Sequence, residues 1–306
     1  MAAAKLTGVL APVVTPFDRD LSVDHGRLVS HCRWLLSQEC GLALLGTNSE
    51  ANSLSLEERI SLLDAVVEAG LPPARMMPGT GCCSLPETVA LTRHAIELGC
   101  AGVLMLPPFY YKKVSDDGLF GYFSEVIQRV GDSRLRIYLY HIPPVAQVPL
   151  SLPLLERLLS KHPRSVVGMK DSGGDWSYTQ SVLNNLPNFG VFVGSEQFLL
   201  AGMRNGGIGC VSATVNVNPK AIHDLYVNWR AQDADDKQAA LSATRAVIQS
   251  FSMIPALKAI IAHHVGDPDW VTVRPPLVAL SAEQRHRLAE ALDDRGFGMP
   301  GVNGSE

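Results

Sequence analysis

The sequence lacks the features that mark several large classes of protein. Its formal net charge is only −4 over 306 residues, without the basic stripe that binding to nucleic acids or anionic membranes requires. No apolar run reaches the roughly 18 residues that a membrane-spanning helix needs. Residues 1–5 have no signal-peptide organisation. We therefore expect a cytoplasmic protein without a nucleic-acid or membrane partner.

Metal-binding patterns are also missing. The six cysteines are scattered and form no C-x-x-C pair, which favours reduced thiols over a disulfide framework or a zinc site. His263 and His264 are neighbours on a predicted helix and cannot both face one ion, while His141 stands alone on a predicted strand. The sequence therefore predicts no metal centre.

A glycine-rich phosphate loop is absent after the first apolar run, and no Walker, dinucleotide or nucleophile-elbow motif occurs elsewhere. The sequence instead shows a regular alternation of strand-like and helical patterns. Strand-like runs begin near Gly8, Gly41, Arg75, Gly102, Arg136, Ser165, Phe189 and Gly207. Eight such runs, separated by segments of helical period, predict an α/β fold, a (β/α)8 TIM barrel rather than an open doubly wound sheet.

The strand-like runs stop near residue 230. We expect residues 1–230 to form the barrel with the active site and residues 231–306 to form a C-terminal helical appendix packed on it. The glycine-rich tail from about residue 296 is expected to be loose. Helix starts are marked by capping boxes, Ser-x-x-Glu or Ser-x-x-Gln, which begin at Ser55, Ser84 and Ser281.

The segment 165–172 contains the first candidate for chemistry. It predicts a buried strand that ends in Lys170, and barrel enzymes keep their chemistry at the C-terminal ends of strands. A neutral lysine amine is a nucleophile that forms a Schiff base with a ketone. From this segment alone, a solvated strand-end lysine is the more common case.

Other predicted strand ends add polar groups that change this balance. The turn Gly46-Thr-Asn-Ser-Glu50 suits an anion such as a carboxylate, although ordinary helix capping uses the same residue types. Tyr110 and Tyr140 end two further strands, and two phenols beside one lysine suggest a proton relay. Small polar groups and one carboxylate follow the last strands, at Gly194, Glu196 and Ser212.

In this order and spacing, the motifs resemble the dihydrodipicolinate synthase / N-acetylneuraminate lyase family of pyruvate-dependent Schiff-base aldolases. The resemblance runs from Gly8 to about Asn218. It rests on Pro12-Val-Val-Thr-Pro16, Gly46-Thr-Asn-Ser-Glu50, Pro108-Phe-Tyr-Tyr111, Tyr140-His-Ile-Pro143 and Gly168-Met-Lys170-Asp171.

The resemblance implies a role for each matching residue. Lys170 would carry the imine, so that no separate cofactor is needed, and Tyr140 would shuttle protons. Thr47 would link Tyr140 to Tyr110, which in the family enters the site of a neighbouring subunit. Thr47 and Asn48 would hold the carboxylate of pyruvate. The expected assembly is a homotetramer, a dimer of dimers.

Departures from the family pattern bear on the substrate. Asn48 and Ser49 replace a hydroxyl residue and a glycine that are common at the carboxylate turn. Diaminopimelate-pathway synthases carry an arginine five residues beyond the tyrosine, where this chain has Val145, and an isopropyl group cannot bind a carboxylate. The sequence around Ser172 resembles family members that act on 2-keto-3-deoxy sugar acids.

The resulting hypothesis is a lyase that cleaves, or forms, a 2-keto-3-deoxy sugar acid or related 4-hydroxy-2-keto acid, giving pyruvate and an aldehyde. A dehydratase on the same imine is the alternative, and 4-hydroxy-tetrahydrodipicolinate synthase is less favoured. A barrel that only senses keto acids is the non-enzymatic alternative. The expected substrate-binding residues are Thr47, Asn48, Ser172, Gly194, Glu196 and Ser212.

Overall fold

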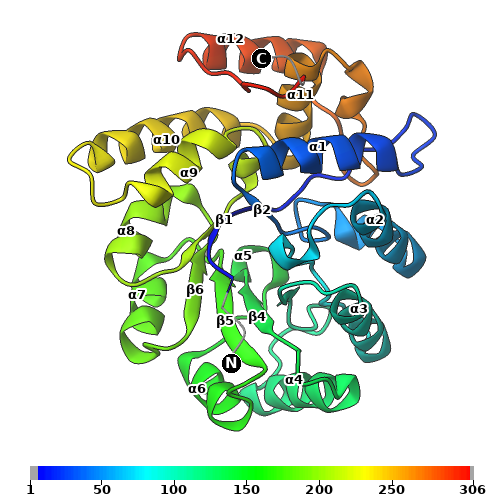
Figure 1. Ribbon diagram of the computed structural model, residues 1–306, viewed down its shortest axis with the longest axis vertical. Coiled ribbons are helices and arrows are strands. Elements are labelled where there is room, and N and C mark those ends of the chain that lie inside the picture. Colours follow the sequence, from blue (N-terminus) through cyan, green and yellow to red (C-terminus); the bar gives the residue numbers. More distant parts are fainter. Residues whose placement is uncertain (1–5, 304–306) are drawn as a thin grey trace.

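Within residues 6–303, which the computed structural model describes, seven parallel strands form the centre of the protein (Figure 1). They are β1 (Gly8–Ala11), β2 (Gly41–Leu42), β3 (Val103–Met105), β4 (Ile137–His141), β5 (Val166–Asp171), β6 (Gly190–Val193) and β7 (Gly209–Val211). Their order in the sheet is β2-β1-β7-β6-β5-β4-β3. Residues 1–5, where we expect no signal peptide, and residues 304–306 of the expected loose tail lie outside the described residues.

The run predicted as a strand near Arg75 is not a regular strand, which corrects the expected count. Residues 76–80 instead form single parallel bridges to Leu42 on one side and Leu104 on the other. The Met77 N–H donates to the Leu42 carbonyl (2.8 Å), and the Leu104 N–H donates to the Pro78 carbonyl (2.9 Å). A proline has no N–H to contribute to a ladder, so regular pairing is interrupted there. The segment nevertheless joins the two edge strands, and the predicted TIM-like barrel is confirmed.

Helices follow the strands and cover the outside of the barrel (Figure 1). Ser55 forms the predicted reciprocal capping box with Glu58, whereas Ser84 caps only the Glu87 N–H. The helices are α1 (His25–Ser37), α2 (Leu56–Glu68), α3 (Leu85–Glu97), α4 (Asp116–Val130), α5 (Pro143–Ala146), α6 (Leu152–Lys161), α7 (Trp176–Asn185), α8 (Leu199–Arg204) and α9 (Pro219–Val227).

Three further helices, α10 (Ala234–Gln249), α11 (Met253–Val265) and α12 (Ala282–Asp293), gather at one end of the molecule (Figure 1). Helix α11 is apolar around most of its circumference, and residues 255–262 are all buried. A helix that is apolar on every side is stable only when other elements enclose it. Helices α10 and α12 and the two 3-10 turns Ala213–Asn216 and Pro268–Val271 supply that enclosure. The division of the chain at residue 230 stays a prediction.

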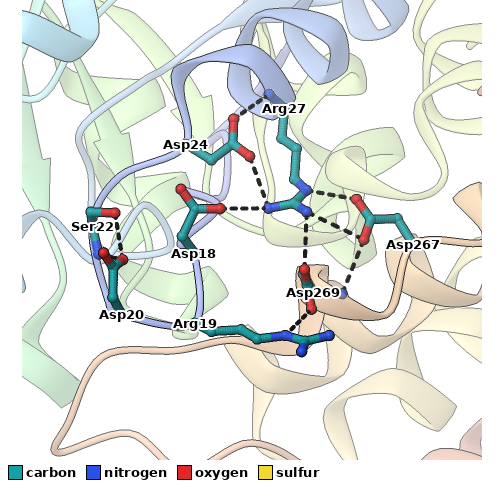
Figure 2. A network of polar contacts seen from close by, with 8 residues as sticks. All are labelled: Asp18, Arg19, Asp20, Ser22, Asp24, Arg27, Asp267 and Asp269. Atoms are coloured by element: carbon teal, nitrogen blue, oxygen red, sulfur yellow. Dashed lines mark hydrogen bonds and ion pairs between the residues drawn. The ribbon is translucent and has the colours of Figure 1, made fainter.

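A network of ion pairs links α1 and the loop before it to the C-terminal part of the chain (Figure 2). The guanidinium of Arg27 lies against Asp18 and Asp24 from its own region and against Asp267 and Asp269 from the segment after α11. The Arg27 side chain is 20% exposed, so these charges are less screened than those of a surface pair. The network thus holds the first and the last thirds of the chain together.

Residues 296–303 of the tail make contacts with the rest of the chain, and the expectation that the tail is loose stays a prediction. Met299 is buried, and the Trp34 indole N–H donates to the Pro300 carbonyl (3.0 Å). The Asn303 side chain donates to the His264 carbonyl (2.9 Å). These hydrogen bonds join the tail to residues of α1 and α11.

Within the described chain, no single helix has the length and apolarity to cross a membrane. Helices α10 and α11 reach those limits only when taken as a pair, and they meet at a bend of 104°.

His31 on α1 predicts a pH dependence of stability. It is buried between Trp34 and Trp270, and burial lowers its pKa to about 4 against a hydrogen bond with Asn216. Between pH 6.5, the ordinary pKa of histidine, and pH 4, the His31 ring is protonated in the unfolded chain but neutral in the folded chain. As the pH is lowered from 6.5 to 4, His31 should therefore reduce the free energy of unfolding by about 1.4 kcal/mol per pH unit.

Urea unfolding at several pH values in that window measures the slope. His31→Gln keeps a side chain of similar size that does not titrate, so its slope should be shallower than that of the unaltered protein by this amount. Equal slopes in the two proteins would contradict the assignment to His31.

Candidate active site

A β-bulge in β5 determines where Lys170 points. Ile137 on β4 pairs with Val166, but the next residue, Tyr138, pairs with Gly168, so Val167 is an extra residue. An extra residue reverses which side chains beyond it face inward. Beyond the bulge, Lys170 therefore faces the barrel interior, level with its pairing partner Tyr140.

Lys170 and Tyr140 form the centre of the site. Lys170 is 2% exposed, and its Nζ donates to the Tyr140 hydroxyl oxygen at 3.0 Å. The same ammonium lies 4.2 Å from the centroid of the Tyr140 ring. The predicted pairing of a strand-end lysine with a tyrosine from the neighbouring strand is present in the structure.

Tyr140 is arranged to exchange a proton. Burial raises its pKa, but the charge of Lys170 and hydrogen bonds with Thr47, Lys170 and Ser172 together outweigh burial and lower the pKa below its usual value. The Thr47 hydroxyl donates to the Tyr140 oxygen at 3.4 Å. A phenol whose oxygen receives hydrogen bonds gives up its proton more readily, which suits a general acid–base.

The turn 46–50 presents Thr47 and Asn48 to the cavity next to Lys170. Ser49, which replaces a glycine of the family pattern, is buried, and its hydroxyl accepts from the Gly46 N–H (3.2 Å). The left-handed backbone positions of this region are Leu45 and Glu50, not Ser49. The serine therefore fits the turn without the strain that a left-handed position would impose.

A buried ion pair holds the far end of this turn. Lys258 from α11 lies 2.5 Å from the Glu50 carboxylate, and both side chains are fully buried. The Lys258 Nζ also donates to the Thr272 carbonyl (2.8 Å), and the Arg274 N–H donates to Glu50 (3.1 Å). Burial lowers the pKa of Lys258 to about 8 although Glu50 opposes that shift. The C-terminal helices thus fix the turn that carries Thr47 and Asn48.

These groups open onto a cavity of about 570 Å³. That volume is within the ordinary range for a small-molecule site and exceeds what a three-carbon acid needs. Gly194 allows a close approach at its wall, because a Cβ there would lie 2.1 Å from the Ser172 hydroxyl. The expected site residues that line the cavity are Thr47, Asn48, Tyr140, Lys170, Ser172 and Gly194.

Three expected residues lie elsewhere. Glu196 and Ser212 are buried behind the cavity wall, where Ser212 and Thr214 donate to the Glu196 carboxylate. The polar atoms of Glu196 and Ser212 therefore bond to other protein groups and do not face the cavity, unlike the expected contact with a substrate. Tyr110 is 74% exposed and does not reach the cavity within one chain, so its role in a neighbouring subunit stays a prediction.

Arg245, from α10, lines the cavity and was not among the expected site residues. Its side chain is 12% exposed, and its Nη1 donates to Glu196 (2.8 Å) and to the Ser212 hydroxyl (2.9 Å). Ser252, just before α11, and the first residues of that helix, Met253 and Ile254, add to the same wall. No local pattern in the sequence indicates this, since Arg245 is one charged residue on an amphipathic helix far from the strand ends.

Val145, at the C-terminal end of α5, also lines the cavity and is 61% exposed. Across the described residues, no group of three histidine, cysteine or acidic side chains is placed to hold a metal ion.

Comparison with known proteins gives one consistent family. A model of the dihydrodipicolinate synthetase family matches residues 5–295. A protein of Chloroflexus aurantiacus described as an uncharacterized DapA-like lyase is 32% identical over 295 residues, which cover 95% of this chain and 97% of that protein.

Solved structures agree. Dihydrodipicolinate synthase from Agrobacterium tumefaciens has a TM-score of 0.88 at 33% identity, with 94% of this chain and 99% of that chain covered. YagE, an Escherichia coli K12 prophage protein of the dihydrodipicolinic acid synthase family solved with pyruvate, has a TM-score of 0.87 at 26% identity. That match covers 96% of this chain and all of YagE.

Proposed function

The chain belongs to the dihydrodipicolinate synthetase family and is a Schiff-base-forming lyase, and we propose that it cleaves a 2-keto-3-deoxy sugar acid or a related 4-hydroxy-2-keto acid to pyruvate and an aldehyde. The observation that carries this proposal is the chain of hydrogen bonds from Lys170 through Tyr140 to Thr47 at the wall of a cavity larger than pyruvate. The keto-acid-sensing alternative does not account for family membership together with this chain.

The proposed reaction begins when the Lys170 amine attacks the C2 carbonyl of the keto acid. The resulting hydroxyl leaves as water with a proton from Tyr140, which gives the protonated imine and leaves Tyr140 as a phenolate. Thr47 and Asn48 hold the carboxylate at the neighbouring turn, which fixes the carbonyl near the amine. The protonated imine then accepts the electron pair of the C3–C4 bond as Tyr140 takes the proton of the C4 hydroxyl. The aldehyde leaves, C3 regains a proton, and hydrolysis of the imine releases pyruvate.

Val145 argues for a substrate tail without a carboxylate at that position. Aspartate semialdehyde would place a second carboxylate there, and an exposed valine offers it neither charge nor hydrogen bonds. The dehydratase alternative begins with the same imine but breaks a different bond. A hydroxyl group leaves the substrate, and the C3–C4 bond stays intact.

We further propose that the active assembly is a homo-oligomer, a dimer of dimers. Tyr110 and Tyr111 are 74% and 73% exposed and pack edge to face on each other (5.3 Å). Two exposed aromatic rings side by side are typical of a surface that another subunit covers. Tyr110 would then join Thr47 and Tyr140 of a neighbouring site.

A panel of acids tests the proposed reaction. Purified protein is incubated separately with 2-keto-3-deoxygluconate, 4-hydroxy-2-oxopentanoate, and pyruvate plus aspartate semialdehyde. Pyruvate, aldehyde and dehydrated keto acid are then measured. We expect pyruvate and aldehyde in equal amounts from a hydroxy keto acid.

Dehydrated acid without aldehyde would establish the dehydratase instead. Condensation with aspartate semialdehyde at a rate comparable to that on the best hydroxy keto acid would refute the interpretation of Val145.

A further inference from the structure

The wall of the cavity contains a cation that the proposed chemistry does not use. Of the described residues that line the cavity, Lys170 and Arg245 carry the positive charges, and Lys170 is the nucleophile. Arg245 comes from α10, outside the barrel strands, and its side chain is 12% exposed. A long charged side chain that is nearly buried at a cavity wall, rather than extended into water, requires a structural or functional reason.

The contacts of Arg245 fix its guanidinium in one place. Its Nη1 donates to the Glu196 carboxylate and to the Ser212 hydroxyl. Glu196 is held in turn, since Ser212 and Thr214 each donate to one of its oxygens. Gln238, also on α10, donates to the Glu196 carbonyl at 2.9 Å and so fastens the helix to the segment that carries Glu196. A donor held in this way loses little conformational entropy when it binds a ligand.

Some of the hydrogen-bond donors of Arg245 remain free. A guanidinium has five N–H groups, and the two on Nη1 are directed to Glu196 and Ser212. The Nε–H is buried and has no partner. Because Nε is shielded from the cavity, the two N–H groups of Nη2, which is not buried and has no hydrogen-bond partner among the described residues, are the donors left for a ligand.

Charge decides which kind of ligand fits. The Arg245 charge is offset by the Glu196 carboxylate 2.8 Å away, so the pair offers little net attraction to a second carboxylate. It offers fixed N–H donors, and Ser195, Gln197 and Ser252 add hydroxyl and amide groups to the same cavity. Neutral hydroxyl groups suit such a set, because they accept from N–H donors and donate to amide oxygens.

We propose that Arg245, positioned by Glu196 and Ser212, hydrogen bonds to the hydroxyl groups of the substrate's tail and thereby selects polyhydroxylated keto acids over short ones. This inference rests on the proposed function. Arg245 is the specificity-determining residue, and Glu196 and Ser212 are positioning residues that act through it.

The test compares two substrates that share the reacting carbons and differ in the tail. 2-Keto-3-deoxygluconate carries hydroxyl groups beyond C4, and 4-hydroxy-2-oxopentanoate carries only a methyl group there. Arg245→Lys retains a positive charge for Glu196 but removes the planar set of donors. We expect kcat/KM on the gluconate to fall ~10- to 100-fold, mainly through KM, and kcat/KM on the pentanoate to change less than ~3-fold.

A second variant guards against loss of folding. Arg245→Met/Glu196→Gln removes both charges, so that no buried carboxylate is left unpaired. It should show the same selective loss on the gluconate. For both variants, borohydride trapping of pyruvate on Lys170 reports whether the reacting end of the site is intact.

Equal losses on the two substrates, or none on either, would overturn the assignment of Arg245. A loss on the diacid 2-keto-3-deoxyglucarate without a loss on the gluconate would overturn it too, because Arg245 would then bind a carboxylate and not the hydroxyl groups. Failure of the unaltered protein to trap pyruvate on Lys170 would reject the proposed function itself. If trapping succeeds but none of these acids is cleaved, the proposed substrate class and the selection of tail hydroxyls are both rejected, while the imine chemistry stands.

Discussion

Lys170→Met is expected to abolish both imine formation and turnover, with a loss on the order of 10⁴-fold or more. The amine is the only group in the proposed reaction that bonds to the substrate, so nothing else at the site replaces it. Methionine has a similar length and no charge, and Lys170 is buried in the barrel interior, so the fold should tolerate the change. The readout is the peptide mass after borohydride reduction with pyruvate, together with the rate of pyruvate release.

Lys161→Met is the matched control, because Lys161 is exposed at the end of α6. The control variant should trap pyruvate on Lys170 and turn over at the rate of the unaltered protein. Trapped pyruvate on any lysine other than Lys170 in the unaltered protein, or residual turnover of Lys170→Met above about 1%, would reject the Schiff-base mechanism at this residue.

Tyr140→Phe is expected to reduce turnover by a factor on the order of 10² or more while imine formation persists in part. The substitution removes the oxygen that receives hydrogen bonds from Lys170 and Thr47 and leaves the ring in place. Without the phenol, the proton of the C4 hydroxyl has no acceptor at that point of the cavity. The fraction of protein trapped by borohydride and the single-turnover rate separate imine formation from bond cleavage.

Tyr138→Phe is a close control for this prediction. Tyr138 lies on the same strand and in the same interior cluster, but its hydroxyl oxygen accepts from the Leu6 N–H (3.0 Å), away from the cavity. Its loss should cost about 1 kcal/mol of stability and leave turnover within a few-fold of the original. If both variants lost turnover equally, the effect would come from barrel packing and not from proton transfer.

Family membership and the structure together explain why the C-terminal helices are part of the site. Lys258 on α11 holds the turn with Thr47 and Asn48 through Glu50, and Arg245 on α10 lines the cavity. In our proposal, the helices therefore contribute both to carboxylate positioning and to recognition of the tail. In the sequence, these helices show only the apolar periodicity that is typical of a helix packed on a core.

Local sequence patterns predicted most of the helices and strands of this protein and indicated the residues of its proposed chemistry. The alternation of strand and helix periods depends on residues within a few positions of each other, and so does capping at Ser55 and Ser281. Both can therefore be recognised in one sequence. The same holds for Lys170 and Tyr140, because strand ends are local features and barrels collect them at one face.

Tertiary structure decided the features that depend on contacts between distant segments. The bulge at Val167, which turns Lys170 inward, exists only in the pairing of β5 with β4. The partner of Glu196 is Arg245, 49 positions along the chain, and the tail near Met299 makes hydrogen bonds with residues of α1 and α11. Sequence specifies which groups are available, but which buried charge finds which partner depends on burial and strand register, and these are set only when the whole chain has folded.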